Sequence, residues 1–209
     1  MKSTKIYSFI GNFTSFYDFL ETITGYKKSV KYFVSQLPFP SDQNIKILDA
    51  GCGTGTYTFA ILEQYKNAHI TAFDRDEKHI EYLKRRVVEK NLENKVDAFV
   101  EDLIGSLSRI HDKKFDLILT SGVLVYVPHE ETIRKLSHFL TSEGYFFNIP
   151  NRDSLWGRFV CRLYACKPYS REENVAVFER NGFELINNIK VPSTPTASFK
   201  DAHIFRKLT

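Results

Sequence analysis

The sequence predicts an α/β protein with a doubly wound, mostly parallel sheet that carries helices on both faces. Three observations lead to this prediction: short apolar runs alternate with helical segments from residue 45 onward, a glycine-rich turn follows the first of these runs, and 209 residues suit one domain. Strands that alternate with helices pair in parallel, and the right-handed crossovers between them place helices on both faces of the sheet.

The first strand is expected at residues 45–50, and it leads into the turn Gly51-Cys52-Gly53-Thr54-Gly55. A helix is expected next, at 54–65. Glycine permits positive φ angles and lets a ligand approach the backbone closely. The N-terminus of the helix then presents free N–H groups to a negative group. This stretch predicts a site for a nucleotide-like ligand.

The alternation continues up to residue 149. A long charged helix has Ile80, Leu83 and Val87 on one face, which predicts that this face packs on the sheet. Strands are expected at 69–74, 96–100, 115–120 and 145–149, and helices at 77–90, near 107 and at 130–140.

After residue 150 the alternation ends. One helical segment is expected within 151–168. Another helix begins at Ser170, which forms a capping box with Glu173, and it ends at Asn181-Gly182. Strands at 183–189 and 202–208 have no helix between them, so we expect them to pair antiparallel.

The first forty residues are rich in aromatic side chains at roughly helical spacing. We expect a helical cap at 1–40 on an α/β core at 45–209, the two forming a single domain. The cap either stabilises the sheet or closes over a ligand. In the second role Tyr17 or Tyr26 would meet that ligand, and one segment can serve both roles.

Composition excludes several classes of protein. The net charge of +4 comes without a basic block, so no nucleic-acid partner is expected. We find no apolar run long enough to span a membrane and no signal-peptide pattern, which predicts a cytoplasmic location. The three cysteines are odd in number and lack metal-ligand spacing, so no metal is expected.

Two acids near the glycine turn indicate the kind of ligand. The turn departs from the dinucleotide pattern Gly-x-Gly-x-x-Gly, because Thr56 stands in the third place. Asp49, at the end of the first strand, suits a ligand with an ammonium group. Asp74 ends the second strand 21 residues after Gly53, where an acid can accept both hydroxyls of a ribose. The alternative for Asp74 is to cap the next helix, a role for which Asp76 is better placed.

This stretch resembles motif I of the class I S-adenosylmethionine-dependent methyltransferases. The similarity extends from about residue 45 to the C-terminus, through Asp102-Leu103 and the later Asn181-Gly182-Phe183. One departure is Ser142-Glu143-Gly144, where relatives usually carry a double glycine before the fifth strand.

The resemblance implies a seven-stranded, Rossmann-like methyltransferase fold whose last strand is antiparallel. It implies S-adenosylmethionine as cofactor and S-adenosylhomocysteine as product. Asp102 and the backbone N–H of Leu103 would hold the adenine. Ligands of open parallel sheets bind where the strand order reverses, between the first and fourth strands here, so Ser121 and Gly122 are expected near the methyl group. Asp102 could also cap the short helix that follows, and Arg75 could be solvated instead of lying over the adenine. The cofactor-binding residues implied are Asp49, Gly51, Cys52, Gly53, Thr54, Asp74, Arg75, Asp102, Leu103 and Ser121.

Candidates for catalysis and acceptor binding follow the fourth and fifth strands. His129 could act as a general base, with Tyr126 as a second candidate, although a surface position at a helix start is the favoured interpretation for His129. A stripe of apolar residues from Trp156 to Tyr164 could meet a membrane or a greasy substrate, but a helix that covers the sheet is favoured. The candidate substrate residues are Tyr17, Tyr126, Asn148, Asn151 and Arg152.

The function predicted is methyl transfer to a small-molecule acceptor by in-line displacement, without a metal. A lipid-like quinol or phenol is an alternative acceptor. A non-catalytic binding module on the same fold is a second alternative. A dinucleotide-dependent oxidoreductase is disfavoured by Thr56.

Overall fold

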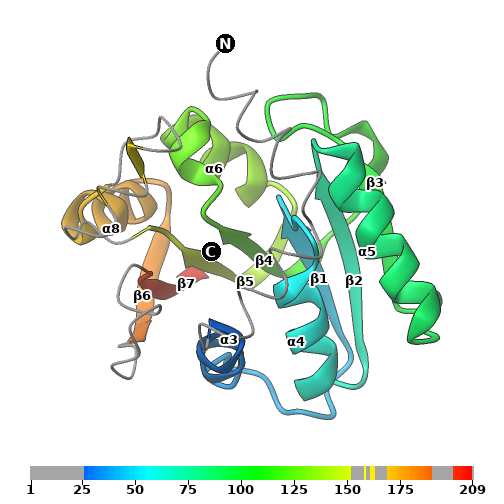
Figure 1. Cartoon of the computed structure of the whole chain (residues 1–209). Helices are drawn as coiled ribbons and strands as arrows, with labels where there is room; N and C mark the ends of the chain where they lie inside the picture. The colour runs from blue at the N-terminus through cyan, green and yellow to red at the C-terminus, as the bar shows by residue number, and fades with distance from the viewer. Residues whose placement is uncertain (1–25, 152–157, 159–160, 163–168, 190–199, 209) are drawn as a thin grey trace.

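The computed structural model describes residues 26–151, 158, 161–162, 169–189 and 200–208. A seven-stranded sheet in the order β3-β2-β1-β4-β5-β7-β6 forms the centre of the molecule (Figure 1). The first five strands pair in parallel, and β7 runs antiparallel to both β5 and β6. The strands are β1 (Ile45–Ala50), β2 (Ala68–Asp74), β3 (Val96–Val100), β4 (Phe115–Ser121), β5 (Leu140–Ile149), β6 (Phe183–Ile189) and β7 (Ala202–Lys207). The predicted mostly parallel sheet and the antiparallel last strand are confirmed.

Helices cover both faces of this sheet, as the alternating pattern predicted (Figure 1). The described α-helices are α3 (Tyr26–Val34), α4 (Thr56–Gln64), α5 (Glu77–Glu89), α6 (His129–Ser137) and α8 (Arg171–Arg180), and the short 3-10 helices are η1 (Ser108–Ile110) and η2 (Leu124–Tyr126). One apolar cluster joins the sheet to α3, α4 and α5, and a second joins the opposite face to α6 and α8. Each strand supplies alternate residues to the two clusters, so most of the sheet is buried on both sides.

The caps predicted for α5 and α8 are present. Asp76 Oδ1 accepts a hydrogen bond from Lys78 N at 2.9 Å. Ser170 and Glu173 form the reciprocal capping box of α8, and Gly182 ends that helix at φ 80°. These short-range signals set the ends of the two helices without help from the rest of the fold.

Two predicted boundaries are wrong. The helix expected at 130–140 ends at Ser137, and Leu140 begins β5 by pairing with Phe115 of β4. The helix expected from Thr54 begins at Thr56, because Gly55 adopts φ 84° and cannot continue a right-handed helix backward. The position that lacks the double glycine lies inside β5, where the pairing with β4 shifts register, and Glu143 there takes φ 59°, a left-handed conformation that glycine would adopt without strain.

Helix α3 packs against α4 on one face of the sheet. The Tyr26 and Tyr57 hydroxyls lie 3.3 Å apart, and the Tyr65 hydroxyl donates to the carbonyl oxygens of Val34 and Leu37 at 3.3 Å each. These contacts support the stabilising role expected for the later part of the cap. Tyr17 lies outside the described residues, and the lid role stays a prediction.

Only part of the segment at 151–168 belongs to the described residues. Arg158, Cys161 and Arg162 are helical, with Cys161 buried and both arginines exposed. Arg152 and the apolar stripe from Trp156 to Tyr164 lie outside the described residues. Within the described part of the chain, we find no helix whose length and apolar character would let it cross a membrane.

Candidate functional site

The glycine turn after β1 is tied to the end of β2. Gly51 N and Cys52 N both donate to Phe73 O, at 2.8 and 3.0 Å. The three glycines have φ angles of 79°, 53° and 84°, so each uses the left-handed region that other residues rarely adopt. The turn is therefore a compact loop, and the positive φ angles of its glycines determine the direction in which its backbone N–H groups point.

The three glycines have different surroundings. A Cβ at Gly51 would lie 2.4 Å from Val123 Cγ2, and one at Gly55 would lie 2.5 Å from Leu83 Cδ1. At Gly53 no atom of the described residues lies within 4 Å of such a Cβ. Gly51 and Gly55 thus permit close packing inside the protein, whereas Gly53 borders open space. The surface beside Gly53 is where a ligand can approach the loop.

The N-terminus of α4 opens directly after this loop. Its N-cap, Gly55, has no side chain that could accept a hydrogen bond from the first-turn N–H groups. Such groups bind anions well, because they point along the helix axis and the helix dipole adds positive potential. The carboxylate of an amino-acid-like ligand suits this position.

Asp74 links β2 to the glycine loop through its carboxylate. Oδ2 accepts from Gly53 N and Oδ1 accepts from Asp76 N, both at 2.9 Å. His79 Nδ1 lies 3.8 Å from Oδ1, an ion-pair distance and not a hydrogen bond. Asp74 is thus not the cap of α5, a role that Asp76 performs. The ribose contact stays a prediction, and the remaining lone pairs of the carboxylate can accept further hydrogen bonds.

The pKa of Asp74 and that of His79 move apart. Burial would raise the pKa of Asp74, but His79 and the N–H donors of Asp76 and Gly53 outweigh it and lower that pKa. Burial would likewise lower the pKa of His79, but the Asp74 carboxylate raises it. Asp74 is therefore ionised at neutral pH. Sequence reasoning missed His79. Its position on the first turn of α5, shortly after the acid that ends β2, could have indicated it.

Asp49 lies beneath the glycine loop, on the face of the sheet covered by α4. Its side chain is 1% exposed and its Oδ2 accepts from the Thr58 hydroxyl at 2.6 Å. Burial raises the pKa of Asp49 to about 7, and the negative charge of Asp74 adds to this effect. Burial also raises the pKa of Cys52, so its thiol is protonated at neutral pH. A direct contact between Asp49 and a ligand ammonium stays a prediction.

Asp102 and Leu103 follow β3 at the same edge of the sheet. Asp102 is exposed, and its Oδ1 accepts from Ile104 N at 3.0 Å. It does not cap the short helix, because η1 begins at Ser108 with Leu107 as its N-cap. The Leu103 side chain is buried among the residues packed with α6. Arg75 is exposed at the start of the turn after β2.

The loop after β4 borders the glycine loop. Ser121 ends β4 beside Ile149 of β5, and Val123 two residues later packs against Gly51. The contact between Val123 and Gly51 confirms that the exits of β1 and β4 adjoin, as expected where the strand order reverses. Tyr126 ends η2 and is half-buried.

His129 is the first residue of α6 and is buried, so the surface position predicted for it is wrong. Its ring is 7% exposed and stacks on Tyr169, with 4.3 Å between the ring centroids. Among the described residues neither ring nitrogen has a hydrogen-bond partner. Burial lowers the pKa of His129, so the ring is neutral at pH 7 and can accept a proton.

A chain of buried polar groups runs from β4 to β7. The Thr120 hydroxyl donates to Asn148 Oδ1 and Asn148 Nδ2 donates to Asn174 Oδ1, both at 3.0 Å. Asn174 Nδ2 lies 3.2 Å from His203 Nδ1. Burial lowers the pKa of His203 to about 4. Both ends of the Asn148 amide are thus used inside the protein, and its predicted role in acceptor binding stays untested.

Asn151 lies just past the end of β5 and is 6% exposed. Its backbone forms an isolated antiparallel bridge with Lys200, which precedes β7. Lys200 is itself 8% exposed, and sequence reasoning missed it because nothing around it in the chain marks a site. Within the described residues we find no group of three or more His, Cys, Asp or Glu side chains suited to a metal ion.

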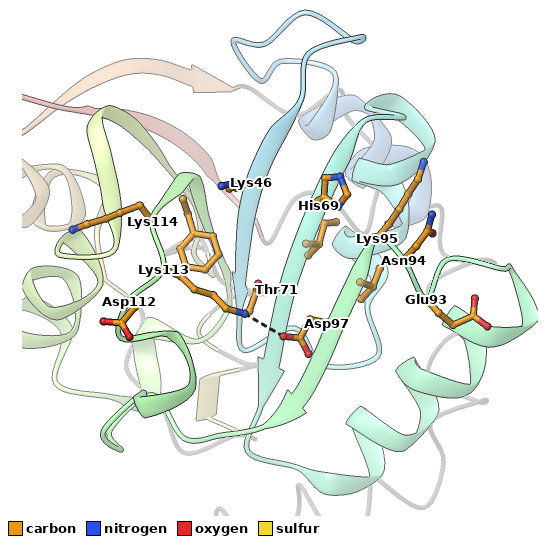
Figure 2. A pocket seen from close by; sticks show the side chains of 13 residues that line it. Lys46, His69, Thr71, Glu93, Asn94, Lys95, Asp97, Asp112, Lys113 and Lys114 are labelled. Atoms are coloured by element: carbon orange, nitrogen blue, oxygen red, sulfur yellow. Dashed lines mark hydrogen bonds and ion pairs between the residues drawn. The ribbon is translucent and has the colours of Figure 1, made fainter.

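A pocket of about 520 Å³ lies at the opposite edge of the sheet, where β1 to β4 begin (Figure 2). Lys46, His69, Lys95 and Lys113 line it together with Asp97, and Lys113 Nζ lies 3.2 Å from Asp97 Oδ2. Ligands of open parallel sheets bind at the carboxyl ends of the strands. We therefore place the candidate site at the glycine loop and not in this pocket.

Comparisons with known proteins identify the family of this chain. A family described as a methyltransferase domain matches residues 41–155, which include β1 to β5 and the glycine loop. A probable (S)-tetrahydroprotoberberine N-methyltransferase from Papaver bracteatum is 29% identical over 48% of this chain and 27% of its own length. The curated relatives that match are much longer than their aligned part, which is 27% to 40% of their length for the first two.

Solved structures share the fold at low sequence identity. Magnesium protoporphyrin IX methyltransferase from Synechocystis PCC 6803, with bound SAH, has a TM-score of 0.69 and 15% identity, covering 88% of this chain and 84% of that chain. The [4+2]-cyclase SpnF has a TM-score of 0.72 and 14% identity, covering 88% and 82%. These likenesses show the Rossmann-like methyltransferase fold alone. Together with the family match over more than half of the chain, they show that this protein belongs to the class I S-adenosylmethionine-dependent methyltransferase family.

Proposed function

We propose that the protein is an S-adenosylmethionine-dependent methyltransferase that acts on a small-molecule acceptor and releases S-adenosylhomocysteine. The observation that carries this proposal is the glycine loop: Gly53 borders open space while its N–H donates to the strand-end carboxylate of Asp74. Family membership and the SAH-bound structural neighbour support the same cofactor.

The residues around the loop fit this cofactor. Asp74 is ionised and keeps lone pairs for ribose hydroxyls, and the uncapped N-terminus of α4 suits the methionine carboxylate. Asp102 and the backbone of Leu103 follow β3 at the same edge, where the adenine would lie. The cofactor supplies an activated methyl group on a sulfonium. The protein has to align that group with the acceptor and exclude water.

Proton removal from the acceptor is the one step that needs a further group. His129 is our candidate base, because its buried ring is neutral at pH 7 and its nitrogens have no partner among the described residues. Acceptors that are already anionic at neutral pH, or that attack through an unprotonated nitrogen, would need no base. The roles of Tyr126 and Asn151 in holding the acceptor belong to the same proposal.

Calorimetric titration with S-adenosylmethionine and S-adenosylhomocysteine tests the cofactor site directly. We expect saturable binding of both at one site per chain. A generic assay for S-adenosylhomocysteine release, run over amine, phenol, carboxylate and thiol acceptors, then tests transfer. Lack of binding at millimolar concentrations of either compound would end the proposal.

One observation favours the alternative function, a binding module on the same fold that does not transfer methyl groups. SpnF shares the fold at a TM-score of 0.72 and is described as a [4+2]-cyclase, so this architecture does not by itself specify methyl transfer. A chain that binds S-adenosylmethionine tightly but releases no S-adenosylhomocysteine with any acceptor would support this second function. The lipid-like acceptor rests on the apolar stripe outside the described residues, and sedimentation with liposomes is its test.

A further inference from the structure

We propose that Lys200, beside Gly122 at the exit of β4, binds an anionic group of the acceptor, either a carboxylate or a phosphate. This inference rests on the proposed function, since it names the class of acceptor for the same site. The inference gives a recognition role to Lys200, which lies more than 75 residues after Gly122 in the sequence.

The pairing of β5 with β7 fixes the position of Lys200. The antiparallel register continues for two residues past the two strands: Asp201 N donates to Pro150 O at 3.2 Å, and Asn151 bridges Lys200. Asn151 and Lys200 therefore stand opposite each other at the exit of β5. Both lie just outside β5 and β7, and the hydrogen bond between the adjacent residues Asp201 and Pro150 holds the two backbones together.

The two side chains converge on Gly122, the first residue after β4. A Cβ at Gly122 would lie 2.9 Å from Lys200 Nζ and 3.8 Å from Asn151 Oδ1. Gly122 has φ +65° and its N–H donates to Ile149 O at 2.9 Å. The glycine thus has two functions here: it permits the left-handed turn, and it leaves room for an ammonium group beside the backbone.

This ammonium group lies next to the candidate cofactor loop. Gly122 sits between Ser121, expected near the methyl group, and Val123, which packs on Gly51. Lys200 and Asn151 are both more than nine-tenths buried, and charges interact more strongly where water is excluded. A lysine ammonium is a point charge with three donors, which suits the oxygens of a carboxylate or a phosphate. A neutral acceptor would gain much less from this group.

The test compares anions with neutral molecules of the same shape. Thermal unfolding of the full chain, saturated with S-adenosylhomocysteine, is measured with benzoate against benzamide and with phenyl phosphate against phenol. We expect the midpoint temperature to rise with at least one anion and not with its neutral counterpart. The benzoate and phenyl phosphate arms distinguish carboxylate from phosphate. Equal protection by both members of each pair, or no protection by any of the four, overturns the inference.

Variants assign the effect to Lys200. Lys200→Gln is expected to weaken binding of the protecting anion at least tenfold, and Lys200→Arg to retain part of it. Lys113→Gln is the matched control, because Lys113 pairs with Asp97 at the opposite edge of the sheet (Figure 2). Anion binding that survives in Lys200→Gln overturns the inference. If that variant does not fold, Asn151→Asp tests the same site by adding a negative charge beside Gly122, and undiminished anion binding there has the same meaning.

Calorimetry separates this inference from the function on which it rests. A protein that binds S-adenosylhomocysteine but does not distinguish benzoate from benzamide keeps the proposed function and loses the anionic acceptor. A protein that does not bind S-adenosylhomocysteine loses both.

Discussion

Replacing Asp74 by Ala tests the assignment on which the cofactor site depends. The Asp74 carboxylate accepts N–H groups from Gly53 and Asp76, which uses about half of its lone pairs. If the remaining lone pairs hold the two ribose hydroxyls, the variant loses charge-assisted hydrogen bonds to the cofactor. Such a loss costs about 1–3 kcal/mol, or about 5- to 150-fold in affinity.

The same substitution also leaves two backbone N–H groups without their acceptor, so folding stability falls as well. Asp76→Ala provides the control, since Asp76 caps α5 in the same turn but is not proposed to contact the ligand. That control should lose about 1 kcal/mol of stability, as is usual for a lost N-cap, and keep its cofactor affinity.

Calorimetry with S-adenosylhomocysteine and with its 2′,3′-dideoxyribose analogue isolates the sugar contact. The unaltered protein should prefer the natural compound by about 1–3 kcal/mol, and Asp74→Ala should show little preference. An Asp74→Ala protein that still prefers the natural compound by the full factor would refute the ribose assignment. Unchanged affinity for S-adenosylhomocysteine would refute it as well.

Two further predictions concern the glycine loop and the acid beneath it. Gly53→Ala should weaken S-adenosylhomocysteine binding measured by calorimetry, because its Cβ enters the open space beside the loop, whereas Gly55→Ala should chiefly lower the midpoint of thermal unfolding by clashing with Leu83. The reverse pattern would contradict our placing of the ligand. For Asp49, whose pKa is raised to about 7, the folded state holds a proton that the unfolded state releases near pH 4, so its contribution to stability falls as the pH rises to 7. We therefore expect the free energy of unfolding of Asp49→Asn, measured with urea, to increase by about 3 kcal/mol relative to that of the unaltered protein between pH 5 and pH 8. An equal pH dependence of both proteins would contradict the raised pKa.

Much of the fold followed from signals that act over a few residues. The alternation of apolar runs and helical stripes predicted the parallel strands, and the capping box at Ser170 predicted where α8 begins. Where the sequence prediction was wrong, a distant partner decided the outcome. Leu140 continues the helical stripe of α6, yet it belongs to β5 because Phe115 of β4 pairs with it. Helical periodicity cannot predict this outcome, since pairing with a neighbouring strand is what stabilises the strand conformation of Leu140.

The candidate site shows the same division. The order of glycines and the acid after β2 were readable from local spacing, because a tight turn and a strand end need those residue types in any context. The sequence did not predict which part of the loop a ligand can reach. Val123 packs against Gly51 and Leu83 packs against Gly55, and both side chains come from other parts of the sequence.

By itself, the sequence determined that this chain forms a doubly wound sheet with a glycine-rich turn after its first strand, because backbone sterics and hydrophobic periodicity are local properties. Tertiary structure alone decided that Asp49 is buried against Thr58, that His129 is inside and not on the surface, and that Lys200 meets Gly122. These contacts depend on strand register and on helices packed across the sheet. Burial and charge proximity, which set the chemistry of each group, exist only once those distant segments have come together.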